Sequence, residues 1–161
     1  MTAARGLALV AILALPLAAW GRAASPADAR QRSRALDAEV SGLTRSAEVN
    51  HALVELGQLA ERRSQEPRVR QLGARVASQA QQANTELRQL MTRRGLSFPD
   101  GMGADDESRV ADVKEQHGAA LDRGFLDESD SLLREELGVA HQLARQAPDP
   151  DVRRWAAGAQ R

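Results

Sequence analysis

The clearest potential for chemistry lies in a Glu-x-x-His pair, Glu48 and His51. Three residues apart on a helix, a carboxylate and an imidazole share one face, and Glu55 follows one turn later. Di-iron helical bundles combine two such pairs with two further glutamates from other helices. Here neither His117 nor His141 has a glutamate three residues before it. Glu48, His51 and Glu55 are therefore candidate metal ligands, but the pattern predicts no resident cofactor.

Other reactive groups have simpler explanations. A cluster of acids on one predicted helix is typical of a solvated face, and comprises Asp122, Asp127, Glu128 and Asp130. Three arginine pairs fall at or near predicted helix ends, where cations complement the helix dipole; a shared anion-binding surface is the alternative. These pairs are Arg62-Arg63, Arg93-Arg94 and Arg153-Arg154. The chain has no cysteine and no Gly-x-Ser-x-Gly elbow, so we expect no catalytic residues and no enzyme.

The first 24 residues have the three-part layout of a cleavable secretion signal. One charge at Arg5 precedes an apolar stretch from Leu7 to Leu17, and small residues follow around Arg22. The apolar stretch is about half of the roughly 20 residues that a membrane-spanning helix needs. We therefore expect export to the periplasm or the medium, with no stable membrane insertion after cleavage.

The charge balance gives no electrostatic case for nucleic acid. The chain has 22 basic and 22 acidic residues. Because Arg5 and Arg22 lie in the leader, the remainder carries 20 basic against 22 acidic residues. A nucleic-acid-binding surface needs clustered positive charge, so we expect no nucleic-acid partner.

The sequence predicts that the elements which position these residues are all helices. Ser25, Pro26 and Asp28 resemble a helix start, so residues 25–35 are expected to form a polar lead-in to a domain over residues 36–161. Apolar residues recur every three or four positions, and strand-type alternation never lasts. Helices are predicted over about 36–64 and 67–94, from Asp105 onward with a break near Gly118 to Leu121, and from Pro150 to the end.

The expected inner faces come from the same spacing. The third helix is expected to bury Val110, Val113 and His117. The stretch after it is expected to bury Phe125, Leu126, Leu133, Leu137, Ala140 and Ala144. The final helix of about a dozen residues is much shorter than the others, so we expect part of the apolar groove of the bundle to be uncovered.

Several local runs resemble the domain of unknown function 4142 family. They are Val54-Glu55-Leu56-Gly57-Gln58-Leu59-Ala60, Glu66-Pro67-Arg68-Val69, Ala83-Asn84-Thr85-Glu86-Leu87, Arg94-Gly95-Leu96-Ser97-Phe98-Pro99, Leu121-Asp122-Arg123-Gly124-Phe125-Leu126-Asp127 and Asp151-Val152-Arg153-Arg154-Trp155-Ala156-Ala157. The resemblance covers about residues 42–161 and implies a bacterial exported protein with a ferritin-like four-helix bundle, here with a shortened last helix. Histidines are common in the family where this chain has Ala80 and, at or next to the second place, Leu133.

Three functional hypotheses follow. The first is a non-enzymatic cell-envelope bundle that acts by helix–helix contact with a protein partner or with itself. The second is a metal-binding ferritin-like stress protein that uses Glu48, His51 and Glu55. The third is a degenerate, truncated family member with no activity of its own.

Overall fold

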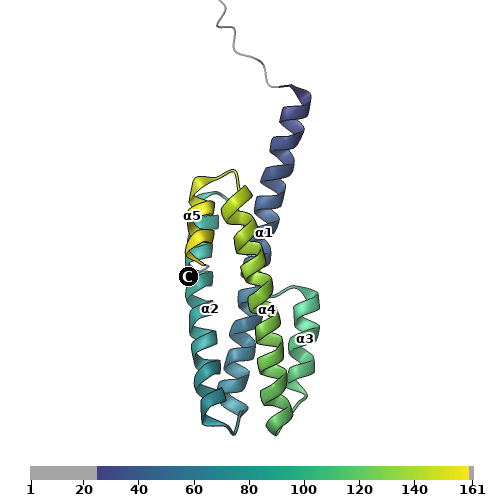
Figure 1. Ribbon diagram of the computed structural model, residues 1–161, viewed down its shortest axis with the longest axis vertical. Coiled ribbons are helices and arrows are strands. Elements are labelled where there is room, and N and C mark those ends of the chain that lie inside the picture. Colours follow the sequence, from purple (N-terminus) through teal and green to yellow (C-terminus); the bar gives the residue numbers. More distant parts are fainter. Residues whose placement is uncertain (1–24, 160–161) are drawn as a thin grey trace, which may run out of the picture.

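Residues 25–159 are described by the structure, a computed structural model, and every regular element among them is an α-helix. In chain order these are α1 (Pro26–Arg63), α2 (Pro67–Arg93), α3 (Ala104–Lys114), α4 (Gly118–Gln146) and α5 (Pro150–Gly158) (Figure 1). The predicted all-helical class is confirmed for this part of the chain. The predicted secretion signal, residues 1–24, lies outside the described residues. None of the five helices combines the length and the apolar character needed to cross a bilayer.

Local capping signals set where the helices begin. Ser25 and Asp28 form a capping box at the start of α1, each side chain accepting a hydrogen bond of 3.1 Å from the other residue's backbone N–H. Proline occupies the first turn of α1, α2 and α5, where its missing N–H costs no helical bond. The expected polar lead-in and the first apolar helix are therefore one continuous helix of 38 residues.

The break between α3 and α4 lies slightly earlier than predicted. α3 ends at Lys114, and α4 begins at Gly118, whose φ of 55° is a left-handed conformation that suits glycine. Val110 and Val113 are buried as expected. His117 was predicted to be an inner residue, and this is wrong: it is the exposed N-cap of α4, because the helix stops before the spacing reaches it.

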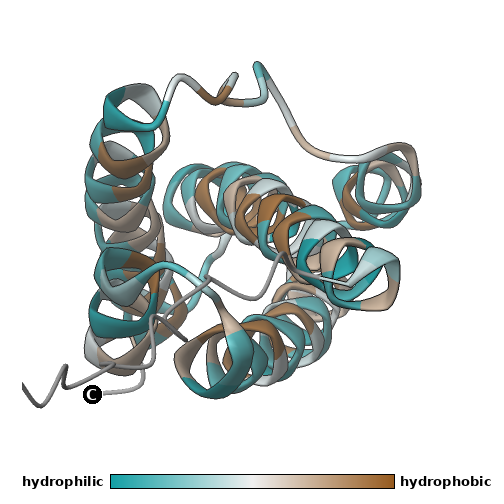
Figure 2. Ribbon diagram, turned by 90° about the horizontal axis from the view of Figure 1, so that it is seen from above, coloured by the Kyte–Doolittle hydropathy of each residue, from teal (hydrophilic) through white to brown (hydrophobic). Residues whose placement is uncertain are grey.

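The long helices pack side by side. α2 and α4 both lie along α1 and run antiparallel to it, α3 packs against α1 and α4, and α5 returns along α4 beside the end of α2 (Figure 1). The first turns of α1 project beyond the other helices, and residues 25–34 are all exposed. Seen from above, apolar residues of the long helices turn toward one another (Figure 2).

α1 and α2 approach each other most closely at two glycines, Gly57 and Gly73, which are both buried. A Cβ added to Gly73 would lie 2.6 Å from the backbone oxygen of Gly57 and 2.9 Å from the Cβ of Ala60. Both distances are shorter than van der Waals contact, so only glycine fits this crossing. The contact fixes how α2 lies on α1.

Two apolar clusters form the core. One lies around Leu53, Leu56, Val113 and Phe125, and the other joins Leu43, Leu87, Met91 and Leu143 to Val152 and Ala156 of α5. The second cluster explains why α5 stays attached although it has nine residues. α3 and α5 are thus short helices beside three long ones.

Candidate interaction surface

α4 carries two apolar faces, and only one of them is buried. Leu121, Phe125, Leu132 and Leu143 are at most 3% exposed. Leu126, Leu133 and Leu137 are 41%, 44% and 44% exposed. These three were predicted to face the core, and this is wrong, because the helix presents two leucine stripes and the neighbouring helices cover one. Ala140 was also expected inside, and it is buried.

The second face continues the surface on which α5 packs. Ala144 of α4 and Ala147, the C-cap of this helix, belong to the same cluster as Val152 and Ala156 of α5. Leu137 is seven residues before Ala144, and Leu133 and Leu126 precede Leu137 by four and eleven residues, so all four share one side of α4. α5 ends at Gly158, and the three leucines remain exposed. We call Leu126, Leu133 and Leu137 the α4 leucine face.

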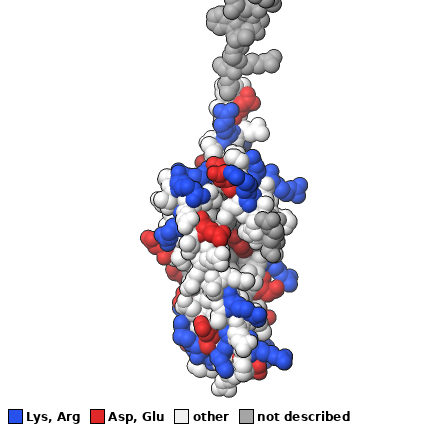
Figure 3. All heavy atoms as spheres, turned by 90° about the vertical axis from the view of Figure 1, so that its left-hand side faces the viewer, with Lys and Arg blue, Asp and Glu red and all other residues white. Residues whose placement is uncertain are grey.

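Charged side chains flank this face. Asp127, Asp130 and Arg134 are exposed, and the Arg134 guanidinium lies 3.0 Å from the Asp130 carboxylate one turn away. The side chains of Arg134 and Asp130 are 77% and 61% exposed, so their pairing contributes little to stability. In the view of the side that carries α2 and α5, uncharged side chains occupy much of the middle, between charges at the ends and edges (Figure 3).

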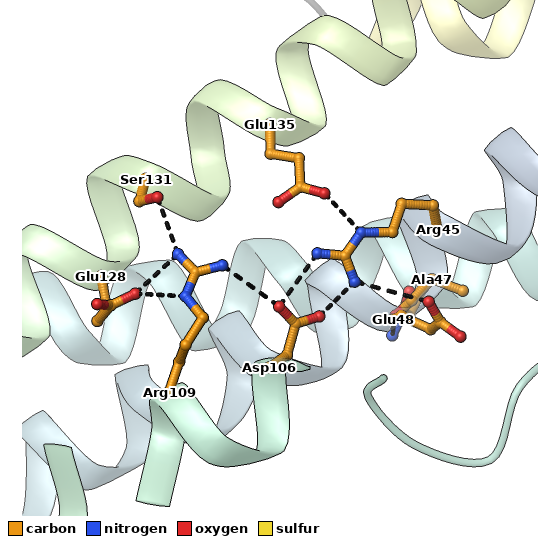
Figure 4. Close-up of polar contacts among 9 residues, drawn as sticks. Arg45, Ala47, Glu48, Asp106, Arg109, Glu128, Ser131 and Glu135 are labelled. Atoms are coloured by element: carbon orange, nitrogen blue, oxygen red, sulfur yellow. Dashed lines mark hydrogen bonds and ion pairs between the residues drawn. The ribbon is translucent and has the colours of Figure 1, made fainter. Parts of the chain in front are cut away.

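A network of ion pairs fastens α3 to α1 and α4 (Figure 4). Asp106 of α3 is fully buried, and both its oxygens accept hydrogen bonds from Arg45 of α1, one of them 3.1 Å long. Arg45 also donates to Glu135 of α4 at 2.6 Å. These carboxylates raise the pKa of Arg45, first through the hydrogen bond to Glu135 and then through Asp106.

Arg109 of α3 extends the same network. It donates to Glu128 and Ser131 of α4, both at 2.8 Å, and lies 3.4 Å from Asp106. The two guanidinium groups are thus occupied by carboxylates of the chain itself. The network orients helices and leaves little unused charge for a ligand.

A second ion-paired group joins α1 to the turn before α5. Glu39 is 1% exposed, and it accepts hydrogen bonds from Arg94 and from the backbone N–H of Asp149, the latter 2.9 Å long. Desolvation acts to raise the pKa of Asp149, but hydrogen bonds from the backbone of Asp151 and Val152, with the charges of Arg94 and Arg153, lower it below 3.8. Asp149 therefore stays ionised and caps α5.

At Glu136 of α4, hydrogen bonds and positive charges offset the cost of burying the carboxyl group only in part. Its Oε2 atom is buried without a hydrogen-bond partner. Burial raises the pKa of Glu136 from 4.5 to about 7, and the neighbouring Glu135 adds to the rise, whereas the Ser46 hydroxyl and Arg45 offset it in part. Asn50 of α1, 4% exposed, likewise has a buried Nδ2 without a partner.

The three candidate metal ligands contact protein groups. Glu48 lies 3.6 Å from Arg45. The Nε2 atom of His51 lies 3.2 Å from the backbone oxygen of Pro99, and its ring packs edge-on against Phe98. Glu55 pairs with Lys114. In residues 25–159 no three His, Asp or Glu side chains are grouped so that they could hold a metal ion.

The other groups singled out in the sequence also turn to separate partners. Of the acidic cluster on α4, Glu128 binds Arg109 and Asp130 binds Arg134. Arg63 donates to the backbone oxygens of Lys114 and Gln116, and Arg153 donates to those of Ala147 and Pro148. These arginines hold helix ends and loops by hydrogen bonds to carbonyl groups.

Sequence reasoning missed the two buried carboxylates, Glu39 and Asp106. A charged side chain on a predicted helix is expected to face solvent unless a partner from another element is known. The available signal was Arg45, a basic residue in the middle of α1, far from the helix C-terminus where a cation would complement the dipole. Charges in such places call for a partner from another element.

Residues 23–161 match the protein-family model described as Domain of unknown function (DUF4142). The match covers most of the chain and agrees with the resemblance seen in the short sequence runs. No curated protein and no solved structure matches the chain.

Proposed function

Because the chain belongs to the DUF4142 family, whose description assigns no activity, we propose a function from the geometry: a non-enzymatic, exported cell-envelope protein that acts by binding another helix. The observation that carries the proposal is the α4 leucine face. Three leucines more than 40% exposed on one side of one helix form a stripe suited to an apolar partner helix. Exposed apolar stripes on soluble domains commonly mark such contacts.

The proposal includes a ferritin-like arrangement of four positions. α1, α2 and α4 occupy three of them, and α5 occupies part of the fourth. A partner helix would complete the fourth position by packing on α4 where α5 does not reach. The polar networks support this role indirectly, since they hold α4 firmly against α1 and α3 from its other side.

Export is tested by fractionating cells that produce the chain with a C-terminal tag. The expected result is a processed protein in the periplasm or medium, with its new N-terminus near residue 25 by mass spectrometry. An unprocessed cytoplasmic protein would remove the envelope location from the proposal.

Helix binding is tested in the native host with a photo-crosslinking amino acid in place of Leu133. The control carries the same group at Ser78, an exposed residue of α2. A discrete crosslinked product at position 133 and none at position 78 is expected. Equal, weak crosslinking at both positions would contradict the proposal.

Metal analysis of the purified protein addresses the second hypothesis. Stoichiometric iron, manganese or zinc that is lost in a Glu48→Gln, His51→Ala variant would replace helix binding by metal binding as the preferred function. The present contacts of Glu48, His51 and Glu55 with separate protein groups favour helix binding.

A further inference from the structure

We propose that the partner helix on the α4 leucine face is α4 of a second copy of this chain, packed antiparallel across a two-fold axis. The inference rests on the proposed function, because it names the occupant of the surface proposed there. It is carried by the order of leucines and charges along α4.

The leucine spacing is compatible with self-pairing. In an antiparallel pair, advancing along one helix means retreating along the other, so residues whose numbers have a constant sum lie opposite each other. An alignment that sets Leu126 of one copy opposite Leu137 of the other also repeats this contact at the opposite end of the pair. The two Leu133 side chains then lie within one turn of each other near the axis. One patch thus covers itself, as an isologous interface requires.

Charges beside the leucines fit the same alignment. Asp127 and Asp130 come before Leu133 in the chain, and Arg134 comes after it, all displaced toward the same edge of the stripe. In an antiparallel pair the same edges of the two helices face each other. Arg134 of each copy then lies within about one turn of Asp127 and Asp130 of the other copy.

A parallel pair would lose these contacts. The charged edge of one helix would then face the opposite edge of the other, so Arg134 would not meet Asp127 and Asp130 of the second copy. The high exposure of Asp130 and Arg134 in the single copy leaves both able to pair across the interface. The charge order therefore favours the antiparallel orientation, in which two identical edges are complementary to each other.

The experiment uses charge exchange in the purified full chain. Arg134→Glu makes this edge of α4 entirely acidic, and the double change Asp127→Arg, Asp130→Arg makes it entirely basic. All three side chains are exposed, so both variants should keep the helical circular-dichroism spectrum of the unchanged protein. Each variant alone should weaken self-association by at least about tenfold in sedimentation equilibrium. An equimolar mixture of the two should associate again.

A cysteine crosslink locates the axis. The chain has no cysteine, so Leu133→Cys introduces a single thiol. Mild oxidation should join two copies through position 133, whereas Ser78→Cys on the exposed side of α2 should not react above the collision rate. Because a disulfide needs Cα atoms within about 7 Å, the product reports the proposed register.

Three results would overturn the inference. One is a monomer at about 100 µM protein. Another is equal crosslinking at positions 133 and 78. The last is failure of the mixed charge variants to associate while the unchanged protein does. A purified monomer that still gives a discrete crosslink from position 133 to a different protein in cells removes self-association and leaves the proposed function standing.

Discussion

The two sides of α1 are built on different principles. Toward α2 it presents Gly57 and neighbouring alanines, and backbones approach until no added methyl group fits. Toward α3 and α4 it adds ion pairs of Arg45 with Asp106 and Glu135 to the apolar contacts of Leu53 and Leu56. The first side depends on shape, and the second depends also on charges supplied by two other helices.

This difference bears on function. A close apolar contact is complete in the single chain, and neither helix can take another partner there. α4 is held on one side by polar contacts and exposes leucines on another, so the surface available for binding lies on α4, away from its ion pairs. The following changes test how far the two sides of α1 differ, starting with the largest expected effect.

Arg45→Met should lower the free energy of unfolding by about 4 kcal/mol, because it leaves the fully buried Asp106 carboxylate with Arg109 as its cation at 3.4 Å. Urea unfolding followed by circular dichroism measures the change. Adding Asp106→Asn to this variant should recover most of the loss, since a buried neutral amide costs less than a buried charge. If the double variant is as unstable as the single one, the contact acts by packing and the contrast with the α2 side disappears.

Gly73→Ala should lower the free energy of unfolding by about 3 kcal/mol, because its Cβ would lie 2.6 Å from the Gly57 oxygen and would push α2 away from α1. The matched control is Gly138→Ala on α4, where an added Cβ meets nothing within 4 Å. That change should stabilise the protein by about 0.5–1 kcal/mol through the better helix propensity of alanine. Similar effects at both glycines would contradict a shape-determined crossing.

Glu136→Gln tests the unpaired part of the polar side. The folded-state pKa of about 7 lies above the ordinary 4.5, so the folded protein binds more protons between these values. The contribution of Glu136 to the free energy of unfolding is therefore fully present below pH 4.5 and is lost as the pH rises through 7. Glutamine does not ionise, so the variant should be more stable than the unchanged protein by about 2 kcal/mol at pH 8.

The measurement for Glu136 is a series of urea unfolding curves between pH 4 and pH 8. The advantage of the glutamine variant should shrink as the pH falls and be absent by pH 4. Glu128→Gln is the control, because that carboxylate of α4 is paired with Arg109 and its loss should give no such gain. Parallel stability profiles for the Glu136 variant and the unchanged protein would show that burial does not raise this pKa.

Features of the fold that depend on local signals could be predicted from the sequence, and those that depend on distant partners could not. Helix starts were predictable where a local signal exists, as at Ser25, Pro67 and Asp149, since caps and prolines act over a few residues. Apolar residues recurring every three or four positions also predicted a helix over about 67–94, and α2 spans Pro67–Arg93.

Predictions that depended on distant partners failed. α4 has leucines on two sides, and its own spacing cannot tell which side another helix will cover; this is why Leu126, Leu133 and Leu137 were misplaced. Glu39 and Asp106 are buried because arginines 55 and 61 residues away neutralise them, which no local pattern records. For the same reason the expectation of a partly uncovered apolar groove beside the short last helix could not be assigned to residues.

Asp149→Ala should have the smallest effect, about 1 kcal/mol of lost stability at pH 7, because it removes the cap that accepts from Asp151 at 2.7 Å. The pKa of Asp149 is lowered in the folded protein, so its contribution is present above the unfolded pKa and is lost as the pH falls. The difference between the two proteins in urea unfolding should therefore narrow below about pH 4. Asp149→Asn is the control: asparagine also caps helices but carries no charge for Arg94, so it should recover most of the stability without the pH dependence. If alanine at this position costs nothing at pH 7, α5 is held by Val152, Ala156 and the backbone contact with Glu39, which alanine keeps, and the Asp149 side chain has no role in fixing where the last helix lies.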